Sequence, residues 1–192
     1  MKALEEKILA EGEVYPGNIL KVAGFLNHQI DVDFLMKMGK EIADLYQDTK
    51  IDKIVTIEAS GIAIAVAAAA YMHVPVVFAK KNKTTNILAD VYSAPVRSYT
   101  HNTEYTVVIS KEHLHPGEKI LLVDDFLAIG NALNGLMQII DQAGGETVGI
   151  AVAIEKGFQG GGDALRAKGV RVESLAIVDS MTDDSVKFRE QP

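Results

Sequence analysis

The sequence predicts an α/β domain whose sheet is largely parallel. Short runs of β-branched and apolar residues, typical of buried strands, alternate with segments whose apolar residues recur at helical spacing. Such an alternation favours a parallel sheet with helices on its faces. The chain has 192 residues, and no repeat or linker divides it, so we expect residues 1–192 to form a single domain.

In the first half of the chain, helices and strands are separated by their periods and end signals. Gly12 ends the first helical stretch, and Asp33 is a candidate N-cap of the second. The apolar run KIVTI and the β-branched run VPVVFAK are typical of strands. The predicted elements are helices at 2–11, 33–46 and 62–72 and strands at 53–57 and 74–80.

The second half begins with a segment of weak periodicity, residues 81–103, which we interpret as a long loop or an irregular hairpin. Loops of this length in compact domains often serve as lids. Beyond it the alternation resumes and continues to the last strand. The predicted elements are strands at 105–110, 119–123, 147–155 and 170–178 and helices at 131–143 and 163–169.

The composition excludes several classes of function. The chain has no cysteine, which excludes disulfides, thiol catalysis and thiolate metal sites. A formal charge of −7 argues against nucleic acid as the main partner, although backbone N–H groups can still hold a small anion. No apolar run reaches the roughly 20 residues of a membrane helix, and the N-terminus lacks the features of a signal peptide. We therefore expect a cytoplasmic protein with small-molecule partners.

ILLVDDFLAIGNAL, residues 120–133, is the strongest candidate site. Asp124 and Asp125 follow a buried strand, and ligands of open parallel sheets bind beyond the carboxyl ends of strands. Carboxylates accept hydrogen bonds from sugar hydroxyls or hold Mg²⁺ through water. The small-residue loop 128–132 then enters a helix, whose free N–H groups and dipole favour a phosphate. Taken alone, the pattern also fits an ordinary strand–turn–helix with an acidic N-cap.

This stretch resembles the phosphoribosyl pyrophosphate (PRPP) motif of the type I phosphoribosyltransferases. The resemblance implies that family's α/β fold, with a small hood formed by about 1–32 and 155–192. It implies that Asp124 and Asp125 hold the ribose hydroxyls, and that Mg²⁺ arrives with PRPP rather than in a dedicated protein site. The implied ligands of the 5′-phosphate are Ala128, Ile129, Gly130, Asn131 and Ala132. Many members have Thr on either side of the glycine, so here backbone N–H groups would carry more of the binding.

Two further stretches gain a role from this resemblance. EASGI, residues 58–62, is typical of a helix cap, but it resembles the family's pyrophosphate loop, which implies that Ser60 and Gly61 contact pyrophosphate. Lys80 and Lys81 fit solvated surface on their own, whereas the resemblance implies that they neutralise the pyrophosphate charge. It also implies that residues 82–103 form a lid that excludes water.

The candidate base site comes from segments far apart in the sequence. ILKVAGFLNHQID at 19–31 and IEKGF at 154–158 resemble the members of this family that use xanthine. The resemblance implies that Leu20 and Asn27 line the purine site and that Lys156 contacts the base. A lysine only donates hydrogen bonds, which suits the O6 acceptor of xanthine, and the Asn27 amide can donate to O2. Without the resemblance, these residues fit a core leucine, a turn cap and a surface lysine.

The resemblance implies transfer of the 5-phosphoribosyl group from PRPP to N9 of xanthine, giving XMP and pyrophosphate in purine salvage. It also implies a homodimer. A first alternative is a guanine or hypoxanthine transferase, since those bases share O6, although the Asp that many such members carry at the place of Ala128 is absent. A second alternative is a regulatory protein that senses PRPP, which we favour less because no basic helix for DNA is present.

Overall fold

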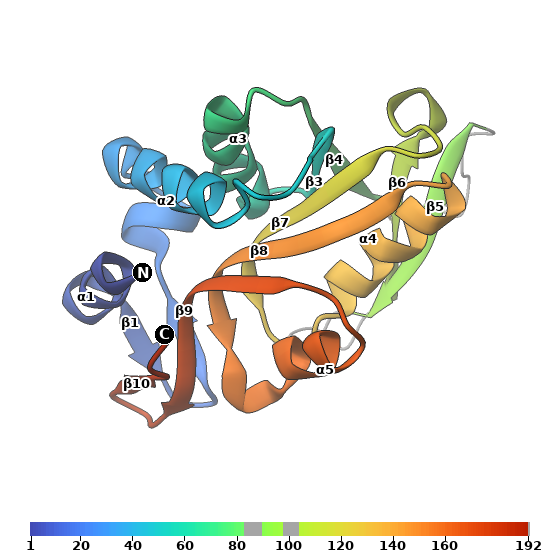
Figure 1. Ribbon diagram of the computed structural model, residues 1–192. Coiled ribbons are helices and arrows are strands. Elements are labelled where there is room, and N and C mark those ends of the chain that lie inside the picture. Colours follow the sequence, from blue (N-terminus) through green and yellow to red (C-terminus); the bar gives the residue numbers. More distant parts are fainter. Residues whose placement is uncertain (83–89, 98–103, 192) are drawn as a thin grey trace.

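An eight-stranded sheet, parallel in its centre, runs through the molecule and confirms the predicted α/β class (Figure 1). The computed structural model describes residues 1–82, 90–97 and 104–191. The strand order is β10-β9-β8-β7-β3-β4-β6-β5; β9, β8, β7, β3 and β4 are parallel neighbours, and antiparallel pairs complete both edges. The strands of this sheet are β3 (Lys53–Ile57), β4 (Val76–Asn82), β5 (Val91–Arg97), β6 (Glu104–Ser110), β7 (Lys119–Leu127), β8 (Glu146–Lys156), β9 (Val172–Met181) and β10 (Val186–Phe188).

Helices cover both faces of this sheet, with α2 and α3 on one face and α4 on the other (Figure 1). Successive residues of β7 show why both faces need cover. Leu121 and Val123 belong to the core shared with α2 and α3, whereas Ile120 and Leu122 belong to the core shared with α4, as the two-residue period of a strand requires. The helices are α1 (Lys2–Glu11), α2 (Val32–Leu45), α3 (Ser60–Met72), α4 (Asn131–Gln142) and α5 (Gly161–Ala167), with short 3₁₀ turns at Lys111–His113 and Gly157–Gln159.

The two chain ends lie beside β9, where the N-terminal segment forms a separate small layer (Figure 1). We call residues 1–31 the N-terminal hood. After α1 it contains a hairpin of β1 (Glu13–Tyr15) and β2 (Ile19–Lys21), then a π-helix at Ala23–Asn27. Within the described residues, no helix is both long and apolar enough to cross a membrane. The predicted single domain, with hood segments 1–32 and 155–192, stays a prediction.

The structure corrects two details of the first half. α2 is capped by Asp31 instead of Asp33: the Asp31 carboxylate accepts a hydrogen bond from the Phe34 N–H at 3.0 Å, which satisfies one of the free N–H groups of the first turn. α3 begins at Ser60, two residues earlier than expected, so the EASG stretch enters the helix directly.

The segment predicted as a loop or irregular hairpin contains a regular edge strand. β5 pairs antiparallel with β6 over all seven of its residues, from Val91 opposite Ser110 to Arg97 opposite Glu104. Pro95 lacks an N–H, but an edge strand tolerates this because only one side of the strand is paired. Residues 91–97 are therefore an edge strand instead of a loop, and the role of the segment as a lid stays a prediction. Residues 83–89 and 98–103 lie outside the described residues.

Candidate active site

The acid pair lies where two neighbouring strands send their helices to opposite faces of the sheet. β3 leads into α3 on one face, and β7 leads into α4 on the other. Open parallel sheets bind ligands in the crevice at such a switch point, beyond the carboxyl ends of the strands. β3 pairs with β7 only as far as Leu122, so Asp124 and Asp125 extend beyond that pairing and reach the crevice.

Asp124 and Asp125 lie within strand β7, although the sequence placed them just after a strand. The strand continues because β8 is long enough to pair with it up to Leu127. Asp124 is 6% exposed, and its Oδ1 accepts the Asp125 N–H at 2.9 Å. Burial, together with the neighbouring Asp125 charge, raises the pKa of Asp124 well above its ordinary value, and burial raises the pKa of Asp125. Burial therefore disfavours the ionised form of the pair, and a bound cation or hydrogen-bond donors would stabilise that form.

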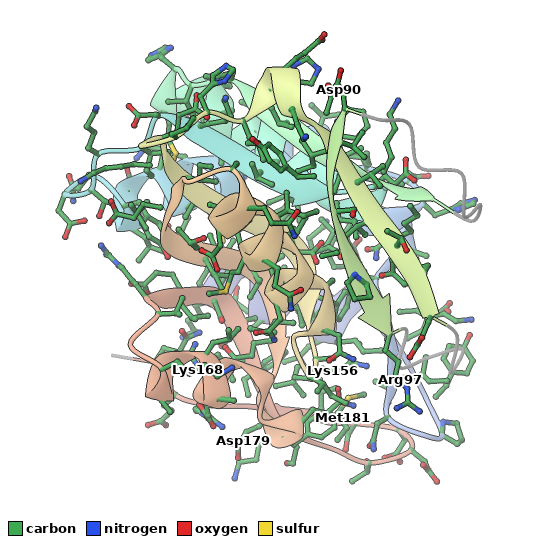
Figure 2. All side chains as sticks on the ribbon, turned by 90° about the vertical axis from the view of Figure 1, so that its right-hand side faces the viewer. Asp90, Arg97, Lys156, Lys168, Asp179 and Met181 are labelled. Carbon is green, nitrogen blue, oxygen red and sulfur yellow. The ribbon has the colours of Figure 1, made fainter. Side chains whose placement is uncertain are left out.

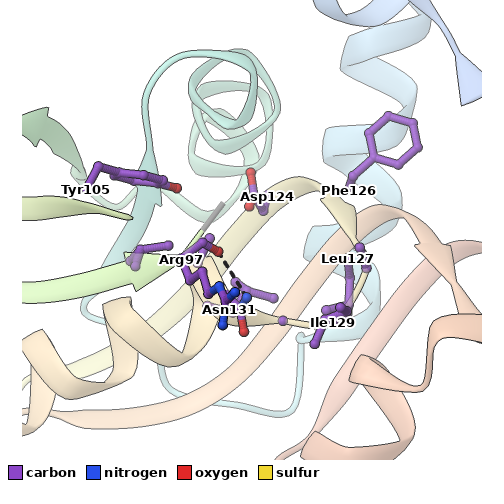
Figure 3. A pocket seen from close by; sticks show the side chains of 12 residues that line it. Arg97, Tyr105, Asp124, Phe126, Leu127, Ile129 and Asn131 are labelled. Carbon is purple, nitrogen blue, oxygen red and sulfur yellow. Dashed lines mark hydrogen bonds between the residues drawn. The ribbon is translucent and has the colours of Figure 1, made fainter. Parts of the chain in front are cut away.

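The loop after the acids forms one wall of a cavity of about 180 Å³ (Figure 3). All five predicted phosphate residues, 128–132, line this cavity together with Asp124. Gly130 has a φ of 89°, a left-handed conformation that glycine adopts without strain, and α4 starts at the next residue. Asn134 Nδ2 donates to the Gly130 carbonyl at 2.8 Å and fixes the turn. The loop thus presents a helix N-terminus to the cavity, as a phosphate site requires.

The start of α3 packs directly against the acid pair. A Cβ atom on Gly61 would lie 2.3 Å from Thr56 Oγ1 and 2.8 Å from Asp124 Oδ1, so only glycine fits there. The peptide bond between Glu58 and Ala59 is cis, and α3 begins at the adjacent Ser60. The structure therefore brings the predicted Ser60–Gly61 loop and the acid pair together.

The two predicted lysines of β4 point in different directions. Lys81 Nζ lies 5.6 Å from the centre of the Tyr105 ring, and its charge acts to lower the pKa of both acids. The Lys81 N–H donates to Glu58 Oε1 at 2.6 Å, which ties β4 to the loop before α3. Lys80 instead lines a separate hollow with Phe78. Because side chains of a strand alternate, only Lys81 faces the acids.

Two residues that the sequence reasoning missed also line the cavity, namely Arg97 and Tyr105 (Figure 3). They come from neighbouring positions of the β5–β6 pair, and Asn131 Nδ2 donates to the Arg97 carbonyl at 3.0 Å. Burial, with a smaller contribution from the Asp124 charge, raises the pKa of Tyr105. No local motif marks either residue, since antiparallel pairing brings them to the site.

Of the predicted base residues, Asn27 in the hood contacts the acid pair, and Lys156 at the end of β8 contacts the hood. Asn27 Nδ2 donates to Asp125 Oδ2 at 2.7 Å, and Lys156 Nζ donates to the Asn18 carbonyl at 2.8 Å. Burial lowers the pKa of Lys156. Figure 2 shows Lys156 at the same end of the sheet as Arg97. Leu20 is 6% exposed and belongs to the apolar core, so the structure places it in the hood interior.

Comparison with known proteins matches residues 28–181 to the model of the phosphoribosyl transferase domain. The xanthine phosphoribosyltransferase 1 of Clostridium perfringens (strain 13 / Type A) is 53% identical over 190 residues, which cover 98% of this chain and all of that protein. The xanthine phosphoribosyltransferase of Clostridioides difficile (strain 630) is 54% identical over 190 residues, with the same coverage.

Solved structures of lower identity have the same fold. The adenine phosphoribosyltransferase of Giardia lamblia, complexed with 9-deazaadenine, superposes with a TM-score of 0.76 at 22% identity, covering 93% of this chain and 98% of that one. The adenine phosphoribosyltransferase of Rhodothermus marinus gives a TM-score of 0.73 at 21% identity, covering 93% and 100%. At these identities the likeness shows the fold alone.

Proposed function

This chain belongs to the phosphoribosyl transferase domain family, and we propose that it transfers the 5-phosphoribosyl group of PRPP to N9 of xanthine, giving XMP and pyrophosphate. The observation that carries this function is one crevice in which an acid pair, a helix start and a small-residue phosphate loop meet. Relatives named xanthine phosphoribosyltransferase, about half identical over nearly the whole chain, support xanthine as the base.

In this proposal the ribose 5-phosphate lies along the cavity at the end of β7. Asp124 and Asp125 accept hydrogen bonds from the ribose hydroxyls, and residues 128–132 bind the 5′-phosphate. The common cavity supports this, because Asp124 and the loop residues line it together. Gly130 and the first N–H groups of α4 supply the donors and positive dipole that a phosphate dianion favours.

The pyrophosphate group lies toward α3 in this proposal. Ser60 and Gly61 offer backbone N–H groups at the first turn of α3, and Lys81 supplies a positive charge. The close packing of Gly61 against the Asp124 side chain supports this placement. The effect of the Lys81 charge, which acts to lower the pKa of Asp124, also supports it. Lys80 lies in the hollow beside Phe78, so we assign the neutralising charge to Lys81.

The base site lies between the hood and the end of β8 in this proposal. Lys156 donates to O6 of xanthine, Asn27 donates to O2, and Leu20 contributes apolar packing from beneath. The Asn27–Asp125 hydrogen bond supports this, because it puts a hood residue beside the ribose site. The lowered pKa of Lys156 follows from a half-buried position, where a base without an acceptor at O6 leaves the lysine donor unpaired, which is costly.

In the proposed reaction, a bond forms between N9 and C1′ while the bond from C1′ to the pyrophosphate oxygen breaks, with inversion at C1′, and the imidazole N–H proton of xanthine is released to solvent. Positive charge develops on the ribose ring, as in other glycosyl transfers. The acid pair stabilises that charge, and the phosphate loop and α3 hold the two ends of PRPP in line. The adjacent carboxylates of Asp124 and Asp125 suit a hard divalent cation. Mg²⁺ bound with PRPP would supply neutralisation of the pyrophosphate charge.

The proposal includes the cytoplasm as the place of action and a homodimer as the working assembly. Large apolar side chains that stand exposed on the neighbouring elements α3 and β4 support an assembly of this kind, namely Val66, Tyr71 and Phe78. Sedimentation of the purified protein tests the dimer directly, and a monomer at micromolar concentration contradicts it.

A base-competition assay tests the proposed function. Protein, Mg²⁺ and PRPP are offered xanthine, guanine, hypoxanthine or adenine separately, and pyrophosphate release is followed. Preference for xanthine supports the assignments of Asn27 and Lys156. Equal use of guanine retains the PRPP site but contradicts the base assignment. Absence of turnover with every base, with PRPP still bound, favours the regulatory alternative.

A further inference from the structure

Glu155 is a fully buried carboxylate that the proposed reaction does not use. It precedes Lys156 on β8, and Arg166 contacts both of its oxygens: Nη2 to Oε2 at 2.7 Å and Nη1 to Oε1 at 3.0 Å. Ser174 Oγ donates to Oε2 at 2.5 Å. A bidentate pair of this kind fixes geometry as well as charge, and a buried charge that loses its partner is strongly destabilising.

This ion pair fastens the short helix α5 to the sheet. Arg166 lies in α5, and its Nε and Nη2 also donate to the Val172 carbonyl at 3.3 and 3.2 Å, so it links the helix to both β8 and β9. Gly162 lies directly on the pair, since a Cβ atom there would be 2.1 Å from Glu155 Oε1. The distance between α5 and β8 is therefore set by the Glu155–Arg166 contact.

The first residue of α5, Gly161, contacts the loop 128–132. The Gly161 N–H donates to the Ala128 carbonyl at 3.2 Å. A Cβ atom on Gly161 would lie 2.2 Å from the Ala128 oxygen and 2.6 Å from the Ile129 carbonyl carbon. The start of α5 thus contacts both the buried ion pair and the loop. At each contact the packing leaves no room for a side chain larger than that of glycine.

We propose that Glu155 and Arg166 are positioning residues for PRPP binding. Their ion pair fixes the position of α5 on the sheet, and α5 in turn fixes the position of Ala128 and Ile129 at the 5′-phosphate site. The inference rests on the proposed function, because it takes residues 128–132 as the phosphate site. A purely structural ion pair would affect folding and both substrates alike. A positioning pair acts selectively on the phosphoribosyl substrate.

The test compares Glu155→Gln/Arg166→Gln with Arg166→Lys and with a matched control, Asp163→Asn. The double variant leaves no unpaired buried charge, and Arg166→Lys keeps the charge but loses the bidentate fork. Asp163 is an exposed residue of the same helix whose Oδ1 lies 3.3 Å from Nη1 of Arg166 and 3.3 Å from Nη1 of Arg189. The readouts are KM for PRPP, KM for xanthine, kcat, and the affinity for ribose 5-phosphate by calorimetry.

We expect the double variant to raise KM for PRPP by about tenfold and to weaken ribose 5-phosphate binding similarly, because small displacements of a binding group are costly. KM for xanthine and the control should change by less than about twofold, and Arg166→Lys should lie between the two. A folded double variant with unchanged KM for PRPP, or with equal rises in both KM values, would overturn the proposal.

Gly161→Ala is a second route if the double variant does not fold. It leaves the ion pair intact but pushes the loop through a Cβ atom that overlaps Ala128 and Ile129. It should raise KM for PRPP selectively, and an unchanged value would overturn the proposal. Failure of the proposed function is distinguishable, because the wild-type protein itself would then release no pyrophosphate with xanthine. Wild-type activity with unaffected variants refutes the positioning role alone.

Discussion

The phosphate side and the base side of the proposed site are built in different ways. On the phosphate side, one continuous stretch of β7, loop and α4 supplies the acids and the loop. The strand β7 at the start of this stretch lies between its parallel neighbours β3 and β8. On the base side, the contacts join distant segments: Asn27 and Asp125 are 98 residues apart, and Lys156 and Asn18 are 138 residues apart.

This difference assigns different kinds of interaction to the two substrates. In the proposed function, the phosphate side uses backbone N–H groups and buried charges, which the fold itself positions. The proposed base side uses a few side-chain hydrogen bonds, which substitution can change without disturbing the sheet. We therefore expect changes on the phosphate side to disable the enzyme, and changes on the base side to alter its preference.

The largest effect is expected for Asp124→Asn, which removes one charge of the acid pair while keeping its size. Loss of the charge that stabilises the transition state should lower kcat/KM by on the order of 10²–10³-fold. Steady-state pyrophosphate release measures this. Asp141→Asn, an exposed carboxylate on α4, is the matched control. A loss no larger than in the control would contradict the assignment of Asp124.

Gly61→Ala tests whether the start of α3 must touch the acids. The added Cβ would overlap Thr56 Oγ1 and Asp124 Oδ1, so the acid or the loop must shift, and kcat/KM should fall by about tenfold or more. Gly24→Ala in the hood is the control, because a Cβ atom there meets nothing within 4 Å. Similar activity of the two variants would contradict the expectation that a change at the phosphate side disables the enzyme.

Lys156→Met probes the base side. Removing the donor for O6 should raise KM for xanthine by roughly 10- to 100-fold, while KM for PRPP stays within about twofold. Initial rates at varied concentrations of each substrate separate the two constants. Lys168→Met, an exposed lysine just after α5, is the control. A parallel rise in both KM values would show that Lys156 supports the whole site instead of the base.

The smallest effect concerns stability and pH. The folded pKa of Asp124 is raised, so the folded protein holds more protons than the unfolded chain, and its stability falls as pH rises from about 4 through the folded pKa. Asn does not ionise, so Asp124→Asn should melt a few degrees higher than wild type at pH 8. The difference should vanish near pH 4. A variant less stable at pH 8, or a difference independent of pH, would contradict the raised pKa.

The sequence predicted the elements and site residues whose signals are local. The strand at 53–57 and the helix at 2–11 have the predicted bounds, because an apolar run and a terminal glycine mark them. The acid pair and loop 128–132 also lie in one continuous stretch, so spacing alone places them together.

Features that depend on pairing between distant segments could not be predicted in this way. The choice between Lys80 and Lys81 depends on which face of β4 each occupies, and a shift of one residue in a strand exchanges the faces. Arg97 and Tyr105 reach the cavity only through the β5–β6 register. The hood strands have three residues each, too few for a period to show.

A crystal structure of the protein with bound XMP would test the central claim most directly. The account predicts the 5′-phosphate on residues 128–132, the ribose hydroxyls on Asp124 and Asp125, and O6 of the base within hydrogen-bond distance of Lys156 Nζ. A nucleotide whose phosphate lies elsewhere, or whose base lies away from Lys156, would contradict the division of the site between the β7 loop and the hood.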